Sequence, residues 1–169
     1  MMTWIISIAG ILVGLPVSIM LIGSFLPEKF GATVSTIIDR PAEAVWSALT
    51  DYVKYPMSAR MCRGVEPLPN ENGLPAWREN LGSSRVRVQT LESVTPSRLV
   101  REMKDEVVPM QVHCEYTVKP AAQGCEVTSS MHGTIRKGTW HVPIFKFMIH
   151  VFGGAKSGQK QFLNSLKGS

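Results

Sequence analysis

The chain has 169 residues, with 18 Lys and Arg against 13 Asp and Glu, and a formal net charge of +5. Its charged fraction of 18% is below the roughly 25% of a typical soluble globular chain. The length and the three cysteines argue against a multidomain enzyme, a disordered chain and a disulfide scaffold. The low charge is local, because no Asp, Glu, Lys or Arg occurs from Met1 to Pro27.

The uncharged start contains an apolar run of 24 residues, Thr3 to Leu26. As a helix this run would be about 36 Å long, enough to cross a hydrocarbon core of roughly 30 Å. A signal peptide is disfavoured, because no basic residue precedes the run and Pro27 follows where small residues belong. A buried core helix is the other alternative. We predict a transmembrane helix over residues 3–26 and an anchor over residues 1–27.

The compartment is inferred from flanking charge and from the cysteines. Lys29 and Arg40 follow the predicted span, and no basic residue precedes it. Cys62, Cys114 and Cys125 are an odd number without metal-like spacing, which suits a reducing compartment and predicts no metal site. We therefore expect a single-pass membrane protein whose main domain is cytoplasmic.

The domain over residues 28–169 begins with a strand and a helix. The β-branched run 32–38 predicts a strand directly after the anchor. Pro41 suits the first position of a helix, and Val45, Trp46 and Leu49 follow at helical spacing. A second, short helical turn is predicted from residue 50 to Tyr55, where Pro56 ends it.

The middle of the chain reads as strands separated by turn signals rich in Gly, Pro, Asn and Asp. Alternation of apolar and polar residues is clearest from Val112 to Val118, which predicts one apolar and one solvated face. Short turns between successive strands favour an antiparallel meander. The six predicted strands are Cys62–Leu68, Leu74–Asn80, Arg85–Val94, Arg98–Lys104, Met110–Lys119 and Cys125–Arg136.

The last quarter carries the positive excess, because Val127 to Ser169 holds six basic residues and no acid. We predict one amphipathic helix over residues 142–167, weakened by Gly153, Gly154 and Gly158. Its apolar face is expected to pack on the sheet and its basic stripe to point outward, either into solvent or toward anionic lipid head groups. Nucleic-acid binding is disfavoured, because no recognition motif accompanies the charge. The basic stripe consists of Lys146, His150, Lys156, Lys160 and Lys167.

Several short motifs, in this order, resemble the SRPBCC superfamily, and within it the polyketide cyclase/dehydrase and lipid-transport branch related to START domains. The resemblance covers residues 32–167. Two positions depart from the pattern: Met57 stands where a Trp is common, and Pro109-Met110-Gln111-Val112 replaces a glycine-rich turn. The matching pieces are Arg40–Trp46, Leu49–Asp51, Tyr55-Pro56, Gly73–Glu79, Thr95–Val100 and Gly124–Thr128.

This resemblance implies an α+β helix-grip fold, in which a seven-stranded antiparallel sheet curves around a long C-terminal helix and leaves an apolar cavity. Trp77 is expected to pack on one face of its strand and Arg78 to point to the other. Arg78 is expected either to form an exposed ion pair or, at the cavity mouth, to hold a polar head group. Flexible methionines would line such a cavity, although a plain Met-rich core explains them equally well. The candidate ligand-binding residues are Trp77, Arg78, Met103, Met110, Val112, Cys114, Tyr116, Met131, Met148 and Phe152.

Catalytic signatures are weak in this sequence. It has no nucleophile elbow, phosphate loop, dinucleotide fingerprint or metal-spaced cluster, so no cofactor is expected and no catalytic residue is assigned. His113 and Glu115 share one strand face, but that face is the polar one and is expected to meet solvent. His132 is expected to be a satisfied or exposed histidine.

We therefore predict membrane-anchored binding, or transport, of a hydrophobic ligand such as a lipid or a polyprenyl or aromatic metabolite. One alternative is a polyketide cyclase/dehydratase-like enzyme acting on a hydrophobic substrate at the membrane. Another is a partner-binding module without a ligand. The expected partners are the hydrophobic small molecule and the membrane, with no nucleic acid.

Overall fold

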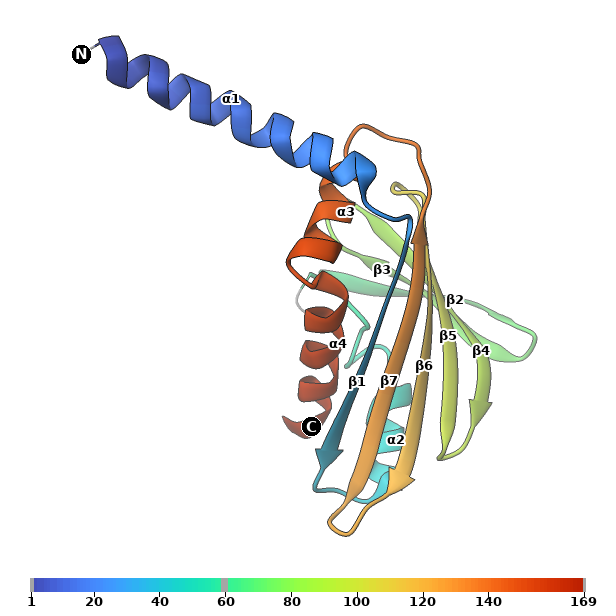
Figure 1. Cartoon of the computed structure of the whole chain (residues 1–169). Coiled ribbons are helices and arrows are strands. Elements are labelled where there is room, and N and C mark those ends of the chain that lie inside the picture. Colours follow the sequence, from blue (N-terminus) through green and yellow to red (C-terminus); the bar gives the residue numbers. More distant parts are fainter. Residues whose placement is uncertain (1, 59–60, 169) are drawn as a thin grey trace.

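A helix of 24 residues, α1 (Met2–Phe25), opens the chain and projects away from the remaining molecule (Figure 1). The structure is a computed structural model that describes residues 2–58 and 61–168, with α1 side chains described from Gly14 onward. Among these described residues, no helix is both long and apolar enough to cross a membrane. The first part of the predicted span, residues 3–13, lies outside the described side chains.

Seven antiparallel strands form one sheet in the order β1-β7-β6-β5-β4-β3-β2. Successive strands from β2 to β7 are neighbours, and β1 pairs with β7, so the predicted meander is confirmed. The predicted boundaries differ from the observed ones by three residues at most. The strands are β1 (Lys29–Ile38), β2 (Gly64–Glu71), β3 (Leu74–Asn80), β4 (Arg85–Val94), β5 (Arg98–Asp105), β6 (Met110–Pro120) and β7 (Cys125–Ile135).

Helix α2 (Ala42–Thr50) covers one end of the sheet and buries the residues predicted from its helical spacing. Val45 and Leu49 are fully buried, and Trp46 is nearly so. Residues 51–55 form hydrogen-bonded turns, and the Tyr55 N–H donates to the Asp51 carbonyl four residues earlier, which is the short helical turn predicted for this segment. This segment crosses the sheet beside β3, where Tyr52 stacks on Trp77 with ring centres 4.4 Å apart.

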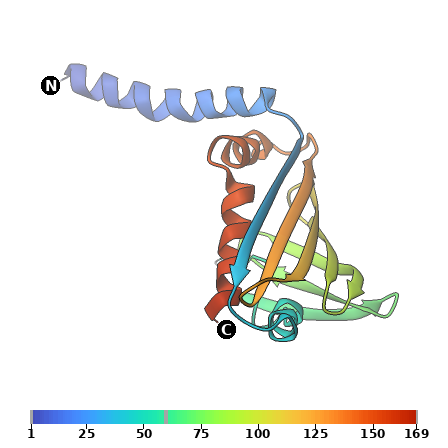
Figure 2. The ribbon, with the colours of Figure 1, turned by 60° about the horizontal axis from the view of Figure 1, so that its bottom comes forward.

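The predicted C-terminal helix is divided into α3 (Val142–Val151) and α4 (Gly154–Ser165), followed by a 3-10 turn, η1 (Leu166–Gly168). Gly153 lies between them with φ of 62°, a left-handed conformation that suits glycine and ends a helix. The predicted weak point is therefore confirmed, but the prediction of one continuous helix is wrong. Helix α4 runs along the concave side of the sheet (Figure 2) and buries Phe162 and Leu163 there.

The break changes which side chains of α3 face outward. Lys146 is only 3% exposed, and its Nζ donates to the Leu26 carbonyl at 3.1 Å. His150 Nε2 lies 3.2 Å from the Pro27 carbonyl. Both basic groups meet the end of α1, where a helix dipole favours positive charge. The prediction that Lys146 points outward is wrong, whereas Lys156, Lys160 and Lys167 are exposed as predicted.

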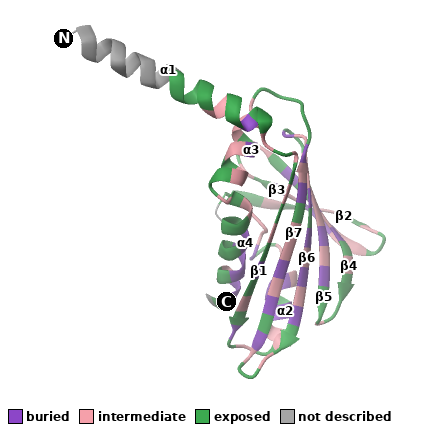
Figure 3. Ribbon diagram, in the orientation of Figure 1, coloured by how far each residue is buried: buried purple, intermediate pink, exposed green. Residues whose placement is uncertain are grey.

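Several apolar residues of α3 are correspondingly exposed (Figure 3), whereas Val142 is buried beneath the helix. Helix α1 rests so closely against α3 that a Cβ at Gly23 would clash with the Pro143 carbonyl group. The two helices thus meet backbone to backbone and present neighbouring apolar surfaces. The exposed apolar side chains are Leu15, Val17, Leu21, Ile22 and Phe25 on the described part of α1, and Trp140, Phe145, Met148, Val151 and Phe152 on or beside α3.

The main core lies between the concave face of the sheet, α2 and α4, and it includes Leu49, Tyr116 and Phe162. A second group surrounds Trp77, and a third lies beneath α3 around Ile135. Burying these apolar side chains is the main favourable term for folding. This arrangement of sheet and C-terminal helix is the predicted α+β helix-grip fold.

Candidate functional site

Side chains of the sheet that point toward α2 and α4 lie on what we call the inner face; the opposite side is the outer face. Of the ten predicted ligand-binding residues, seven lie on the inner face. Met103, Met110 and Met131 are only partly buried and pack at the margin of the main core, where flexible thioethers adapt to neighbours of different shape. The seven are Trp77, Met103, Met110, Val112, Cys114, Tyr116 and Met131.

Arg101 is the most unusual group on the inner face, because it is a cation with only 1% of its surface exposed. Its Nη2 donates to the Leu49 carbonyl at 3.0 Å, and its guanidinium carbon lies 4.8 Å from the centre of the Trp77 ring. Its Nε and Nη1 are buried without a hydrogen-bond partner among the described residues. Burial lowers the pKa of Arg101 from its ordinary value. Buried polar groups are normally satisfied, so two unused donors indicate a place for an acceptor.

Glu79 is buried on the same face but does not pair with Arg101. Its Oε1 accepts hydrogen bonds from the Met57 N–H at 2.8 Å and from Trp77 Nε1 at 3.0 Å, and its Oε2 accepts one from the Ser58 N–H at 2.9 Å. These bonds hold the segment after α2 against β3. The carboxylate is therefore occupied in positioning the wall of the site, and Arg101 keeps its free donors.

Further polar groups lie beside Arg101 on β6 and β7. Tyr116 is buried, with its ring centre 5.5 Å from that of Phe162. Burial raises the pKa of Tyr116 well above its ordinary value and that of Cys114 to about 12, so both are protonated at neutral pH. The side chains of Ser129 and Gln159 are hydrogen-bonded at 3.2 Å between β7 and α4. A few polar groups within apolar surroundings are typical of a small-molecule site.

Three of the predicted ligand-binding residues lie elsewhere. Arg78 is on the outer face, where its Nε donates to Glu106 at 2.8 Å and its Nη1 to Glu66 at 3.0 Å. Of the two expectations for Arg78, the ion pair on the outer side of the sheet is the one observed, and Arg78 does not reach the inner face as a rim residue. Met148 and Phe152 are 50% and 66% exposed, because the break at Gly153 turns α3 away from the sheet. The structure thus removes these three from the candidate site.

The histidines do not supply acid–base groups to the interior. His113 and His132 are exposed on the outer face, as predicted, and stand opposite each other on β6 and β7. His141 and His150 lie at the two ends of α3, away from Arg101. Among the residues that the structure describes, no group of three or more His, Cys, Asp or Glu is placed to hold a metal ion.

Sequence reasoning missed Arg101, Glu79 and Ser129 as site residues. A signal for Arg101 was present, because Leu99, Arg101 and Met103 alternate along β5 and share the inner face. Glu79 likewise alternates with Trp77 on β3. Charge ordinarily argues for exposure, so the alternation alone did not identify these two as buried.

The fold and its interior define a helix-grip protein with a few polar groups buried in an apolar core. The profile of the family "Polyketide cyclase / dehydrase and lipid transport" matches residues 29–168. The chain belongs to this family, as the sequence motifs predicted. No curated protein matches the chain in sequence.

Solved structures share the fold at low sequence identity. The ZhuI aromatase/cyclase from Streptomyces sp. R1128 is 14% identical with a TM-score of 0.64, over 83% of this chain and 92% of ZhuI. The Mll3558 protein from Rhizobium loti is 16% identical with a TM-score of 0.61, over 83% and 96% of the two chains. The di-domain ARO/CYC BexL of the BE-7585A pathway is 12% identical with a TM-score of 0.58, over 86% of this chain and 51% of BexL. These likenesses establish the architecture alone.

Proposed function

We propose that this protein binds a hydrophobic molecule bearing a carbonyl or acidic group, held between the inner face of the sheet and α4. The observation that carries the proposal is Arg101, whose buried Nε and Nη1 have no partner among the described residues. A ligand oxygen would accept from these donors, while the surrounding methionines and aromatic rings would cover its apolar part. The family and the aromatase/cyclase neighbours support binding of a hydrophobic ligand or cyclase activity.

Binding is favoured over acid–base catalysis by the state of the inner-face groups. Glu79 already accepts three hydrogen bonds, and the described histidines lie outside the interior. The Cys114 thiol, with a pKa of about 12, is a poor nucleophile at neutral pH. A cyclase-like enzyme stays the second candidate, because Arg101 and Tyr116 would also polarise the carbonyl group of a bound substrate.

The test of ligand binding compares two arginines of the same strand. Full-length protein, its Arg101→Met variant and its Arg98→Met variant are purified from membranes and analysed by native mass spectrometry, then titrated with oleate and with oleyl alcohol. Arg101 lies inside, whereas Arg98 lies on the outer face. Loss of a charge-assisted hydrogen bond should weaken oleate binding about 10-fold or more in Arg101→Met only.

Oleyl alcohol binding should change less, because it offers no carboxylate to the guanidinium. Thermal unfolding of Arg101→Met should be unchanged or shifted upward, because an unpaired buried cation is removed. Equal oleate binding by all three proteins would overturn the role of Arg101. Absence of both a co-purified ligand and an oleate-induced thermal shift in the unaltered protein would overturn the binding proposal itself.

We further propose that α1 and α3 hold this domain at a membrane. The support is the neighbouring exposed apolar side chains of the two helices, with Trp140, Phe145 and Phe152 as aromatic groups suited to the lipid interface. An open hollow of about 370 Å³ lies between β1 and the α3–α4 break and is lined partly by Phe30 and Ile149. This hollow is our candidate passage for a ligand leaving the bilayer.

Membrane attachment and orientation have direct tests. The full chain should stay in the membrane pellet after alkaline carbonate extraction, and its release into the supernatant would contradict anchoring. We propose a cytoplasmic domain, in keeping with three unpaired cysteines. A membrane-impermeant maleimide should label the partly exposed Cys62 only after the cells are permeabilised. Labelling of Cys62 in intact cells would contradict the proposed cytoplasmic orientation of the domain.

A further inference from the structure

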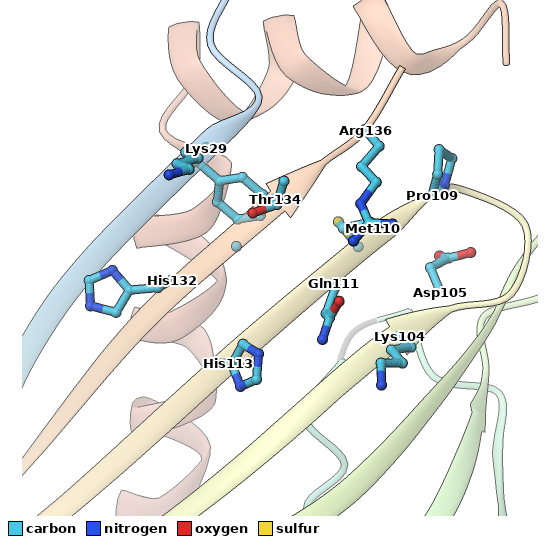
Figure 4. A pocket seen from close by; sticks show the side chains of 12 residues that line it. Lys29, Lys104, Asp105, Pro109, Met110, Gln111, His113, His132, Thr134 and Arg136 are labelled. Atoms are coloured by element: carbon cyan, nitrogen blue, oxygen red, sulfur yellow. The ribbon is translucent and has the colours of Figure 1, made fainter. Parts of the chain in front are cut away.

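A groove of about 500 Å³ lies at one end of the outer face, formed by β1, β7, β6 and the end of β5. Figure 4 shows its side chains: His113, Gln111 and Arg136 lie toward the middle, with Lys29, His132 and Lys104 around them. Its nitrogen-bearing side chains lie on the side of the sheet opposite Arg101, so its donors are distinct from those of the interior site proposed above. Met110, at the margin of the main core, also lines the groove.

The strand register explains why nitrogen-bearing side chains gather there. One row across the sheet is Lys29, Thr134, Gln111 and Lys104, each directly opposite the next. The adjacent row on the same face is Gly31, His132, His113 and Glu102. Residues opposite each other on one face of antiparallel strands lie close together. Two rows of ordinary polar positions, scattered in sequence, thus become one cluster of donors.

The acidic groups near this cluster are already occupied. Asp105 Oδ1 accepts from the Val107 and Val108 N–H groups, and Asp105 Oδ2 accepts from Ser84 Oγ at 2.6 Å. Glu102 pairs with Lys104 and accepts from Gln111 Nε2 at 2.6 Å. Burial alone would raise the pKa of Glu102, but the hydrogen bonds from Lys104 and Gln111, together with the nearby Lys104 and His113 side chains, lower it below its ordinary value.

His113 Nε2 also lies 3.3 Å from Glu102 Oε1, so one carboxylate serves three neighbours. Lys29, Arg136 and His132 form no ion pair among the described residues of the chain. Elsewhere on the outer face Arg78 and Arg98 each bind two carboxylates. Arg85 and Lys119 of this face also form no ion pair among the described residues, but neither lines the groove, whereas the groove brings Lys29, Arg136 and His132 together.

We propose that this groove binds a phosphate-bearing anion. Arg136 supplies a planar fork of donors, and Lys29 supplies a point charge from the opposite side, with His132 and His113 as further nitrogen donors between them. Guanidinium and ammonium groups are the usual partners of phosphate oxygens, since charge-assisted hydrogen bonds are stronger than neutral ones. The Arg136 N–H donates to the Pro109 carbonyl at 2.9 Å, which fixes its backbone at the groove.

The phosphate has two possible sources in the geometry of the chain. Lys29 begins β1 directly after α1, and Arg136 follows the end of β7 at the same end of the sheet (Figure 1). A phospholipid head group would thus be in reach if α1 and α3 hold the domain at a bilayer. A soluble phosphate monoester would use the same donors.

The first experiment uses soluble probes with the full chain in neutral detergent. Inorganic phosphate and glycerol 3-phosphate are titrated against the unaltered protein, the double variant Lys29→Gln/Arg136→Gln, and the control Lys119→Gln/Lys160→Gln. All four lysine and arginine positions are exposed, so folding should be retained. Affinity should fall about 10-fold or more in the groove variant and stay unchanged in the control.

The second experiment measures protection from a water-soluble acetylating reagent by mass spectrometry. The full chain is placed in phosphatidylcholine vesicles with or without phosphatidate, and Lys29 and Lys104 are compared with Lys119 and Lys160. Phosphatidate should protect only the groove lysines, and the Arg136→Gln change should remove that protection of Lys29. If the groove lysines are protected by phosphatidate but soluble phosphate does not bind, the ligand is a lipid head group. If soluble phosphate binds but phosphatidate gives no protection, the ligand is a soluble phosphate monoester.

The proposal is overturned if soluble phosphate binds the groove variant with the same affinity as the unaltered protein. It is also overturned if the soluble phosphates do not bind and phosphatidate gives no selective protection. Arg101→Met should leave both readouts unchanged, because Arg101 lies on the inner face. Failure of the groove proposal is thereby distinguishable from failure of the interior site.

Discussion

Arg98 and Arg101 lie three residues apart on β5, and they face opposite sides of the sheet. Arg98 is half-exposed and binds Glu115 at 2.7 Å and Glu92 at 3.0 Å, and the hydrogen bond that it donates to Glu115 raises the pKa of Arg98. Arg101 is buried, meets a ring and a carbonyl, and has its pKa lowered by burial. An arginine is thus paired with carboxylates on the solvated face, whereas the buried arginine keeps donors without a partner among the described residues.

The contrast shows that a charged group without a full set of hydrogen-bond partners occurs in the interior and not among the ion pairs around Arg98. Exposed ion pairs contribute little to stability, so those of the outer face are expendable. A buried cation without a counter-ion costs free energy, and it persists when the surrounding structure compensates and function requires it. The packing around Arg101 should therefore be sensitive to change, whereas the pairs around Arg98 should not.

The largest expected loss of stability follows from removing Trp77, whose ring contacts the buried Arg101. Trp77→Ala removes a fully buried side chain that contacts Tyr52, Arg101 and Glu79. The free energy of unfolding should fall by about 3–5 kcal/mol, as for other large aromatic truncations in cores. Denaturant unfolding of the full chain in detergent measures this change. Trp140→Ala, at a 71% exposed position, is the control, and an equal loss in both would contradict the assignment.

A smaller loss is expected when the inner carboxylate is neutralised. Glu79→Gln replaces an oxygen that accepts an N–H with an amide group that donates, so a buried donor of the 57–58 segment or Trp77 loses its partner. The free energy of unfolding should fall by about 1–3 kcal/mol. Glu66→Gln, at an exposed position on the outer face, should leave it unchanged. An unaltered unfolding curve for Glu79→Gln would show that the hydrogen bonds accepted by Glu79 do not stabilise the packing of the 57–58 segment on β3.

The smallest effect is expected on the outer face. Arg98→Gln breaks two exposed ion pairs and should give no measurable change in thermal unfolding, because water and salt replace the partners. The measurement is repeated at low and high salt, and both curves should overlay those of the unaltered protein. A clear destabilisation at low salt that vanishes at high salt would show that the outer pairs act as a stabilising network.

Most of the strand pattern was predictable because turns and alternation are local. Turn residues such as those around Gly73 and Gly124 mark where strands end, and the alternation from Val112 to Val118 assigns inner and outer faces correctly. The C-terminal region was less predictable. The pattern of residues 142–167 predicts one continuous helix, but the left-handed turn at Gly153 separates α3 from α4, so the predicted orientations of Lys146, Met148 and Phe152 are wrong.

The fold class, the family and the uncharged N-terminal helical segment follow from the sequence alone, because periodicity, turns and short motifs depend on neighbouring residues. Which charges have partners depends on the folded arrangement. Arg101 meets Leu49 and Trp77 across distant parts of the chain, and Lys29, Lys104 and Arg136 gather through strand register. The partners of a charged side chain are set by its neighbours in space. Neither the buried Arg101 donors nor the groove on the outer face can therefore be predicted from composition.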